Sequence, residues 1–162
     1  MNDAPSPIEI PQHVLEEVYK EARTSFPLEC CGWLAGNRSD SEVTTIRKCL
    51  NAQESGGHPT AASRGGETAY VISGEDLMEL NRSLDGEIPA RIIYHSHPNG
   101  EAYLSSIDRE VATSPWGDGP AYPVQQLVIG INGDRVVESI LFAWSEQENQ
   151  FVEVNRFLGA GI

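Results

Sequence analysis

The sequence is poor in basic residues and in cysteine. Only 11 of its 162 residues are Lys or Arg, against 24 Asp or Glu, which gives a formal net charge of −13. Binding to a phosphate backbone or to an anionic membrane surface needs clustered Lys and Arg, so we expect neither nucleic acid nor a membrane as a partner. The three cysteines, Cys30, Cys31 and Cys49, form an odd set with two adjacent members, which suits neither a disulfide framework nor a four-cysteine zinc site. They predict buried thiols in a reducing cytoplasm.

Long apolar runs are also missing. No stretch approaches the ~20 apolar residues of a membrane-spanning helix, and residues 1–7 lack the basic and apolar regions of a signal peptide. Because 40% of the residues are hydrophobic and 22% charged, the chain can bury a core. Its length suits one domain. We therefore expect a flexible N-terminus over residues 1–10 and a single domain over residues 11–162. The sequence leaves the oligomeric state open, a homodimer included.

Hydrophobic periodicity predicts a mixture of helices and strands, which is the α/β (α+β) class. A helix is expected from Pro11 to Pro27, a second after the N-cap Ser73, and a short third from about Ser106. Strands are expected over residues 31–36, 42–50, 67–72, 89–94, 126–131 and 135–144, and residues 151–157 fit a strand or a helix. Residues 51–66 predict a long loop, which is either a plain insertion or a substrate-binding flap.

The segment that carries chemistry follows the strand expected over residues 89–94. Residues two apart in a strand face the same side, so His95 and His97 can present two imidazoles to one point. Neutral imidazole binds zinc at about 2.0–2.1 Å. Asp108 falls in the first turn of the following helix, from which a carboxylate can return towards the strand end. Two histidines and one aspartate make three ligands, the usual number in a catalytic zinc site with a fourth position for water.

Each half of this pattern also has a plainer interpretation. A single His-x-His pair is more often unrelated to a metal, and Ser105 with Asp108 also forms a helix capping box. The combination of both halves, with a strand before and a helix after, favours the metal site. The other two histidines, His13 and His58, are expected to face solvent.

A hydrolase also needs a group that moves protons, and Glu29 is the candidate. It lies at a helix-to-strand junction among apolar residues and cysteines. A buried carboxylate without a partner is costly, and burial raises the pKa of a carboxyl towards the working range of an acid/base group. The plainer alternative is an exposed glutamate at the junction.

Taken together, these residues resemble the JAMM (MPN-plus) family of zinc metallopeptidases. The resemblance is carried by Glu29 in the run from Pro27 to Gly36, by His95-Ser96-His97-Pro98, and by Ser105-x-x-Asp108. It implies zinc held by His95, His97 and Asp108, Glu29 as the acid/base, and Ser105 positioning water or stabilising the oxyanion. One departure is Leu104, where the family commonly has Pro.

The resemblance also implies a fold and a function. The fold is one MPN-like domain, a central, mostly antiparallel sheet flanked by helices and similar to the cytidine-deaminase architecture. The Glu-Cys-Cys-Gly run looks most like bacterial members that act on ubiquitin-like sulfur-carrier proteins. The implied activity is a zinc-dependent metallopeptidase or isopeptidase that hydrolyses the bond after the C-terminal glycine of such a carrier, releasing an attached amino acid or a C-terminal extension.

Two alternatives stay open beside this function. The first is a non-catalytic MPN-type protein-interaction module, which the loss of a metal ligand would favour. The second is a zinc hydrolase of a small-molecule amide, which a deep, enclosed pocket would favour over an open groove.

Overall fold

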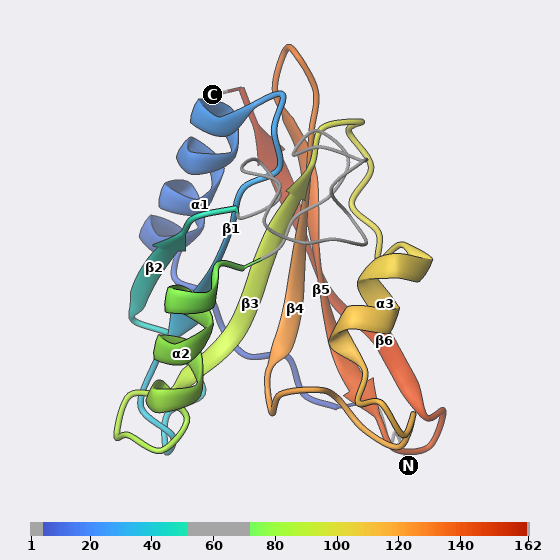
Figure 1. Ribbon diagram of the computed structural model, residues 1–162. Helices are drawn as coiled ribbons and strands as arrows, with labels where there is room; N and C mark the ends of the chain where they lie inside the picture. Colours follow the sequence, from blue (N-terminus) through green and yellow to red (C-terminus); the bar gives the residue numbers. More distant parts are fainter. Residues whose placement is uncertain (1–4, 52–71, 162) are drawn as a thin grey trace.

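A single six-stranded sheet forms the centre of the computed structural model, which describes residues 5–51 and 72–161 (Figure 1). The strand order is β2-β1-β3-β4-β5-β6. Strands β3 and β4 are parallel, and all other neighbouring pairs are antiparallel. The strands span Cys31–Ala35 (β1), Thr45–Cys49 (β2), Ala90–His97 (β3), Gln125–Ile131 (β4), Val136–Ser145 (β5) and Gln150–Ala160 (β6). The expected mixed class with a mostly antiparallel sheet is confirmed, and residues 151–157 belong to a strand.

Helices cover both faces of the sheet. Helix α1 (Gln12–Ser25) packs on a core that includes Leu34 of β1, whereas α2 (Gly74–Ser83) packs on a core that includes Trp33. Adjacent residues of a strand face opposite sides, so α1 and α2 lie on opposite faces. Helix α3 (Ser106–Ala112) contributes to a third cluster with Val128 of β4, on the face that α2 also covers (Figure 1). Within the described ranges, no helix is long and apolar enough to cross a membrane.

The N-terminal segment makes contacts where the sequence suggests flexibility. Glu9 forms a parallel bridge with Glu42: its N–H donates to the carbonyl of Ser41, and its carbonyl accepts from the N–H of Val43. Ile8 and Ile10 pack against the core on the α1 face. Residues 8–10 are therefore attached to the sheet region, although they fall within the stretch expected to be flexible.

Part of the expected structure lies outside the described residues. Of the loop expected over residues 51–66, only Asn51 is described, and of the strand expected over residues 67–72, only Ile72. These two residues form an isolated antiparallel bridge. His58 also lies outside. Of the three cysteines, Cys30 and Cys31 are buried, Cys49 is partly buried, and all three are free thiols.

A polar contact ties α1 to the central strand β3. The hydroxyl of Tyr94 donates a hydrogen bond to Glu21 of α1. Gly32 of β1 makes this approach feasible, because a Cβ there would lie 2.5 Å from the Tyr94 hydroxyl. Burial raises the pKa of Glu21 to about 7, although the Tyr94 hydrogen bond and the nearby Lys48 oppose that shift. The folded state thus favours the protonated form of Glu21.

This contact predicts a pH-dependent part of the stability. The pKa of Glu21 rises from an ordinary value of 4.5 to about 7 on folding, so its contribution is complete below pH 4.5 and is lost as the pH rises through 7. Between about pH 4.5 and pH 8, the free energy of unfolding of the wild type should fall by about 2 kcal/mol relative to Glu21→Gln, after allowing for partial exposure. Urea unfolding across this range measures the difference. The control is Glu16→Gln, an exposed change on the same helix, whose free energy of unfolding should vary with pH as that of the wild type does. If the free energy of unfolding of Glu21→Gln also follows the wild type across this range, the prediction is wrong.

Candidate metal centre

Two histidines converge at the C-terminal end of β3. His95 and His97 are two residues apart and face the same side of the strand. Their Nε2 atoms lie 3.1 Å apart, and the side chains are 0% and 9% exposed. β3 is flanked by β1 on one side and β4 on the other, so the backbone that carries the pair is held from both sides.

Helix α3 brings a carboxylate to the same point. Ser105 caps the helix: its hydroxyl accepts from the backbone N–H of Asp108 at 3.1 Å, and its own N–H donates to Asp108 Oδ2 at 3.1 Å. The same Oδ2 atom lies 3.0 Å from the Nε2 atom of each histidine. The capping box and the convergence with the histidines therefore exist together, and the cap holds the carboxylate that meets the imidazoles.

The three atoms have the chemistry and spacing that zinc requires. They form a triangle with sides of 3.0–3.1 Å. A tetrahedral zinc ion with bonds of about 2.0–2.1 Å keeps its ligand atoms about 3.3 Å apart. Two imidazole nitrogens and a carboxylate oxygen are ordinary zinc ligands. The residues present thus fit a zinc ion.

Burial and mutual contact shift the pKa values of two of these groups. Burial lowers the pKa of His95, and the neighbouring Asp108 only partly opposes this effect. Burial alone would raise the pKa of Asp108, but the adjoining His95 and the hydrogen bonds with both histidines outweigh it, so this pKa lies below its ordinary value. A neutral imidazole beside an ionised carboxylate is the state in which both can bind a metal.

Glu29 lies beside the two histidines. It follows α1 at the junction with β1 and is 4% exposed, so the alternative of an exposed junction glutamate is wrong. One carboxylate oxygen of Glu29 and one ring nitrogen of each of His95 and His97 all lie within 4.8 Å of one another. These three buried residues could hold a metal ion. Asp108 Oδ2 lies 3.0 Å from the Nε2 atom of each imidazole.

Two residues that the sequence patterns do not single out hold the Glu29 backbone. Ser96 accepts a hydrogen bond from the N–H of Cys30 at 2.9 Å, and the Asn51 amide donates one to the carbonyl of Glu29, also at 2.9 Å. Ser96 is visible only as the middle residue of the histidine pair. Asn51 has no local signal, because its partner lies 22 residues away in sequence.

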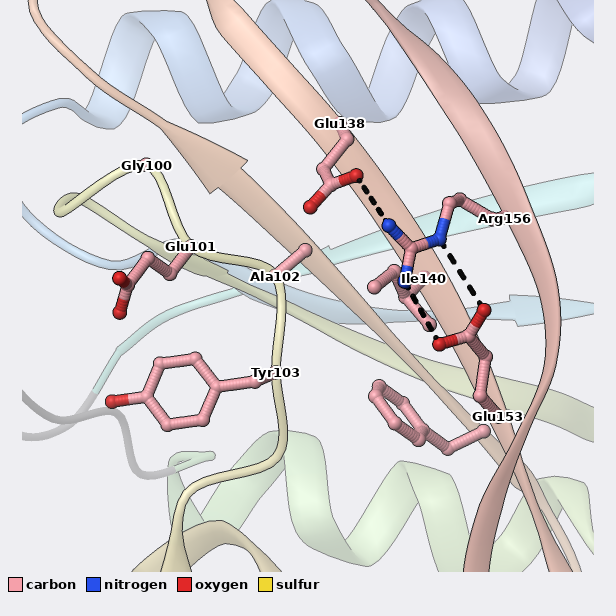
Figure 2. Close-up of a pocket in the computed structure, with 9 residues that line it drawn as sticks. Gly100, Glu101, Ala102, Tyr103, Glu138, Ile140, Glu153 and Arg156 are labelled. Carbon is pink, nitrogen blue, oxygen red and sulfur yellow. Dashed lines mark hydrogen bonds and ion pairs between the residues drawn. The ribbon is translucent and has the colours of Figure 1, made fainter.

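A cavity of about 480 Å³ opens on the side of the sheet near the C-terminal half of the chain (Figure 2). It lies between the loop that follows β3 and strands β5 and β6, and Arg156 in its wall pairs with Glu138 and Glu153. Tyr103 lines the cavity and also packs its ring edge-on against His97, with ring centres 5.0 Å apart. The convergent residues are not among those that line the cavity, and the Tyr103 ring connects it to the candidate metal centre.

Comparison with known proteins identifies a family and several relatives. The model for prokaryotic homologs of the JAB domain matches residues 11–145. Proteins named CysO-cysteine peptidase from Mycobacterium bovis and Mycobacterium tuberculosis are 31% identical over 96 residues, which is 58% of this chain and 58% of theirs. The matched region thus spans little more than half the length of these relatives.

Solved structures share the fold. A protein from Desulfitobacterium hafniense superposes with a TM-score of 0.57 at 21% identity, covering 89% of this chain and 87% of that protein. One from Salinibacter ruber gives 0.59 at 17% identity, over 91% and 88%. A JAB1/MPN domain protein from Archaeoglobus fulgidus gives 0.50 at 11% identity, over 91% and 96%. The expected JAB/MPN fold is confirmed, whereas the likeness to cytidine deaminases stays a prediction.

The geometry predicts one zinc ion per chain. His97→Ala removes one of the three converging atoms, so the variant should lose most of the bound zinc, on the order of a hundredfold in affinity. Metal analysis after zinc reconstitution and dialysis measures this loss. The control is His13→Ala, which removes an exposed histidine from α1 and should leave the zinc content unchanged. Equal zinc in both variants would contradict the site.

Proposed function

The chain belongs to the family of prokaryotic homologs of the JAB domain, and on this premise we propose that it is a zinc-dependent peptidase of the JAMM type. The proposed reaction is hydrolysis after the C-terminal glycine of a ubiquitin-like or sulfur-carrier protein, which releases an attached amino acid or a C-terminal extension. The observation that carries the proposal is the convergence of His95, His97 and Asp108 at 3.0–3.1 Å with Glu29 beside them. The relatives named CysO-cysteine peptidase support a peptidase and a carrier-type substrate.

In this proposal each residue has a separate role. His95, His97 and Asp108 would hold the metal, and the chemistry that a bound zinc ion would supply is a lower pKa for a water molecule, down to about 7. The Glu29 carboxylate accepts a proton from the attacking water and delivers it to the leaving amine nitrogen. The Ser105 hydroxyl, which accepts the backbone N–H of Asp108 as helix cap, has its own O–H to donate towards the developing oxyanion.

The charge of the chain bears on the kind of surface that its partner presents. With a net charge of −13, the protein favours a partner whose docking face is basic, through electrostatic complementarity. Loss of a metal ligand would favour the alternative of a non-catalytic interaction module. His95, His97 and Asp108 are all present and convergent, which supports the peptidase instead.

Replacing the acid/base group tests the proposed function directly. Glu29→Gln should keep its zinc, because the three ligands remain, but lose at least about a hundredfold in turnover, because an amide cannot accept the proton. The assay is mass spectrometry of a ubiquitin-like carrier with a C-terminal extension after incubation with zinc-loaded protein. The control is Glu110→Gln, an exposed change on α3, which should cleave like wild type. Wild-type protein that binds zinc but leaves every such carrier intact would overturn the proposed substrate class.

The two roles of Ser105 can be separated with a matched serine. Ser73 caps α2 by the same kind of bond, accepting from the N–H of Asp76. Ser105→Ala and Ser73→Ala should each cost about 1 kcal/mol of stability. Only Ser105→Ala should also lower the turnover number at full zinc loading, on the order of a hundredfold. If both variants turn over at the wild-type rate, Ser105 acts only as a cap.

A further inference from the structure

The polar groups of one buried peptide unit, between Glu29 and Cys30, are both bound by side chains from other parts of the chain. Its carbonyl accepts from the Asn51 amide at 2.9 Å, and its N–H donates to the Ser96 hydroxyl at 2.9 Å. All four residues are buried, with at most 4% of any of them exposed. The backbone N–H of Ser96 also donates to the Cys30 carbonyl at 3.1 Å, which extends the pairing of β1 and β3 by one residue.

We propose that Asn51 is a positioning residue for Glu29: together with Ser96 it fixes the plane of the Glu29–Cys30 peptide and so the direction of the Glu29 side chain. This inference rests on the proposed role of Glu29 as the acid/base group. A peptide is planar, so holding its carbonyl and its N–H from opposite ends fixes the backbone rotation on the C-terminal side of Glu29. This restricts the directions that the Cα–Cβ bond of Glu29 can take, and one carboxylate oxygen lies within 4.8 Å of a ring nitrogen of each histidine.

The two bonds also explain why this peptide can be buried. A buried carbonyl or N–H without a partner is costly, and most such groups in folded proteins are bonded within the backbone. Here the backbone pairing of β1 with β3 begins at the Cys30 carbonyl, so the Glu29–Cys30 peptide before it depends on side chains. Ser96 comes from between the two histidines, and Asn51 from just beyond the end of β2. The position of Glu29 is therefore set by the strand that carries the histidines and by the edge strand β2.

The proposal is tested with Asn51→Leu, which keeps the size of the side chain but removes its donor. The turnover number on a carrier substrate should fall about ten- to a hundredfold. KM should stay within about twofold and zinc content should be unchanged, because neither the ligands nor the substrate surface is altered. The matched control is Asn81→Leu, which removes the same kind of bond, from the Asn81 amide to the Leu77 carbonyl at 2.9 Å on the exposed side of α2. The control should behave like wild type.

A double-mutant cycle distinguishes positioning from a general structural effect. In a Glu29→Gln background, Asn51→Leu should cause no further loss of turnover, because the residue acts through Glu29. Losses that multiply would overturn the proposal. If Asn51→Leu does not fold, as judged by thermal unfolding, Asn51→Ala gives the same comparison, since a smaller side chain leaves room for water at the Glu29 carbonyl.

A second readout needs neither catalysis nor zinc. In the metal-free protein, the carbon NMR resonance of the Glu29 carboxyl group should move in Asn51→Leu and stay in place in Asn81→Leu. An unmoved resonance would overturn the proposal even if turnover fell. If the wild type cleaves no carrier, the proposed function fails, and this resonance still decides whether Asn51 orients Glu29.

Discussion

The contact on which the site depends is the meeting of one carboxylate oxygen with two imidazoles. Asp108 Oδ2 lies 3.0 Å from both His95 and His97 while accepting the N–H of Ser105 at the start of α3. The carboxylate is thus held by its own helix as well as by its contact with the two histidines. Helix capping is a local interaction, so residues 105–108 alone set the position of the Asp108 carboxylate relative to α3. The only long-range contact that the site then needs is the packing of this short helix beside β3.

The sheet allows α3 to pack beside the end of β3. The loop after His97 crosses β4 at Gly130, where a Cβ would lie only 2.6 Å from the carbonyl oxygen of Gly100. The close approach lets the chain turn over the sheet and begin α3 beside the strand end. His97 and Gly130 are paired in the β3–β4 register, so the residue that permits the crossing is the direct neighbour of a candidate ligand. A side chain at this position would displace the loop, and with it the carboxylate.

The parts of the structure that follow local rules could be predicted from the sequence. Alternation along β3 predicts that His95 and His97 share a face, and the spacing of Ser105 and Asp108 predicts the cap. Bonds between a side chain and a distant backbone group leave no such pattern. The partners of Cys30 and Glu29, namely Ser96 and Asn51, lie 66 and 22 residues away. Likewise, Glu9 pairs with Glu42, and no pattern in the first ten residues predicts this pairing.

The burial of charge links the stability of the fold to the occupancy of the site. Glu29 and Asp108 are both buried, and the low pKa of Asp108 keeps that carboxyl ionised. Burial at the same time lowers the pKa of His95, and Asp108 opposes that shift only in part. Such an arrangement is costly in a medium of low dielectric constant, and a divalent cation among these atoms offsets the cost. Since a ligand that binds only the folded chain stabilises it, the metal would act as part of the fold as well as part of the chemistry.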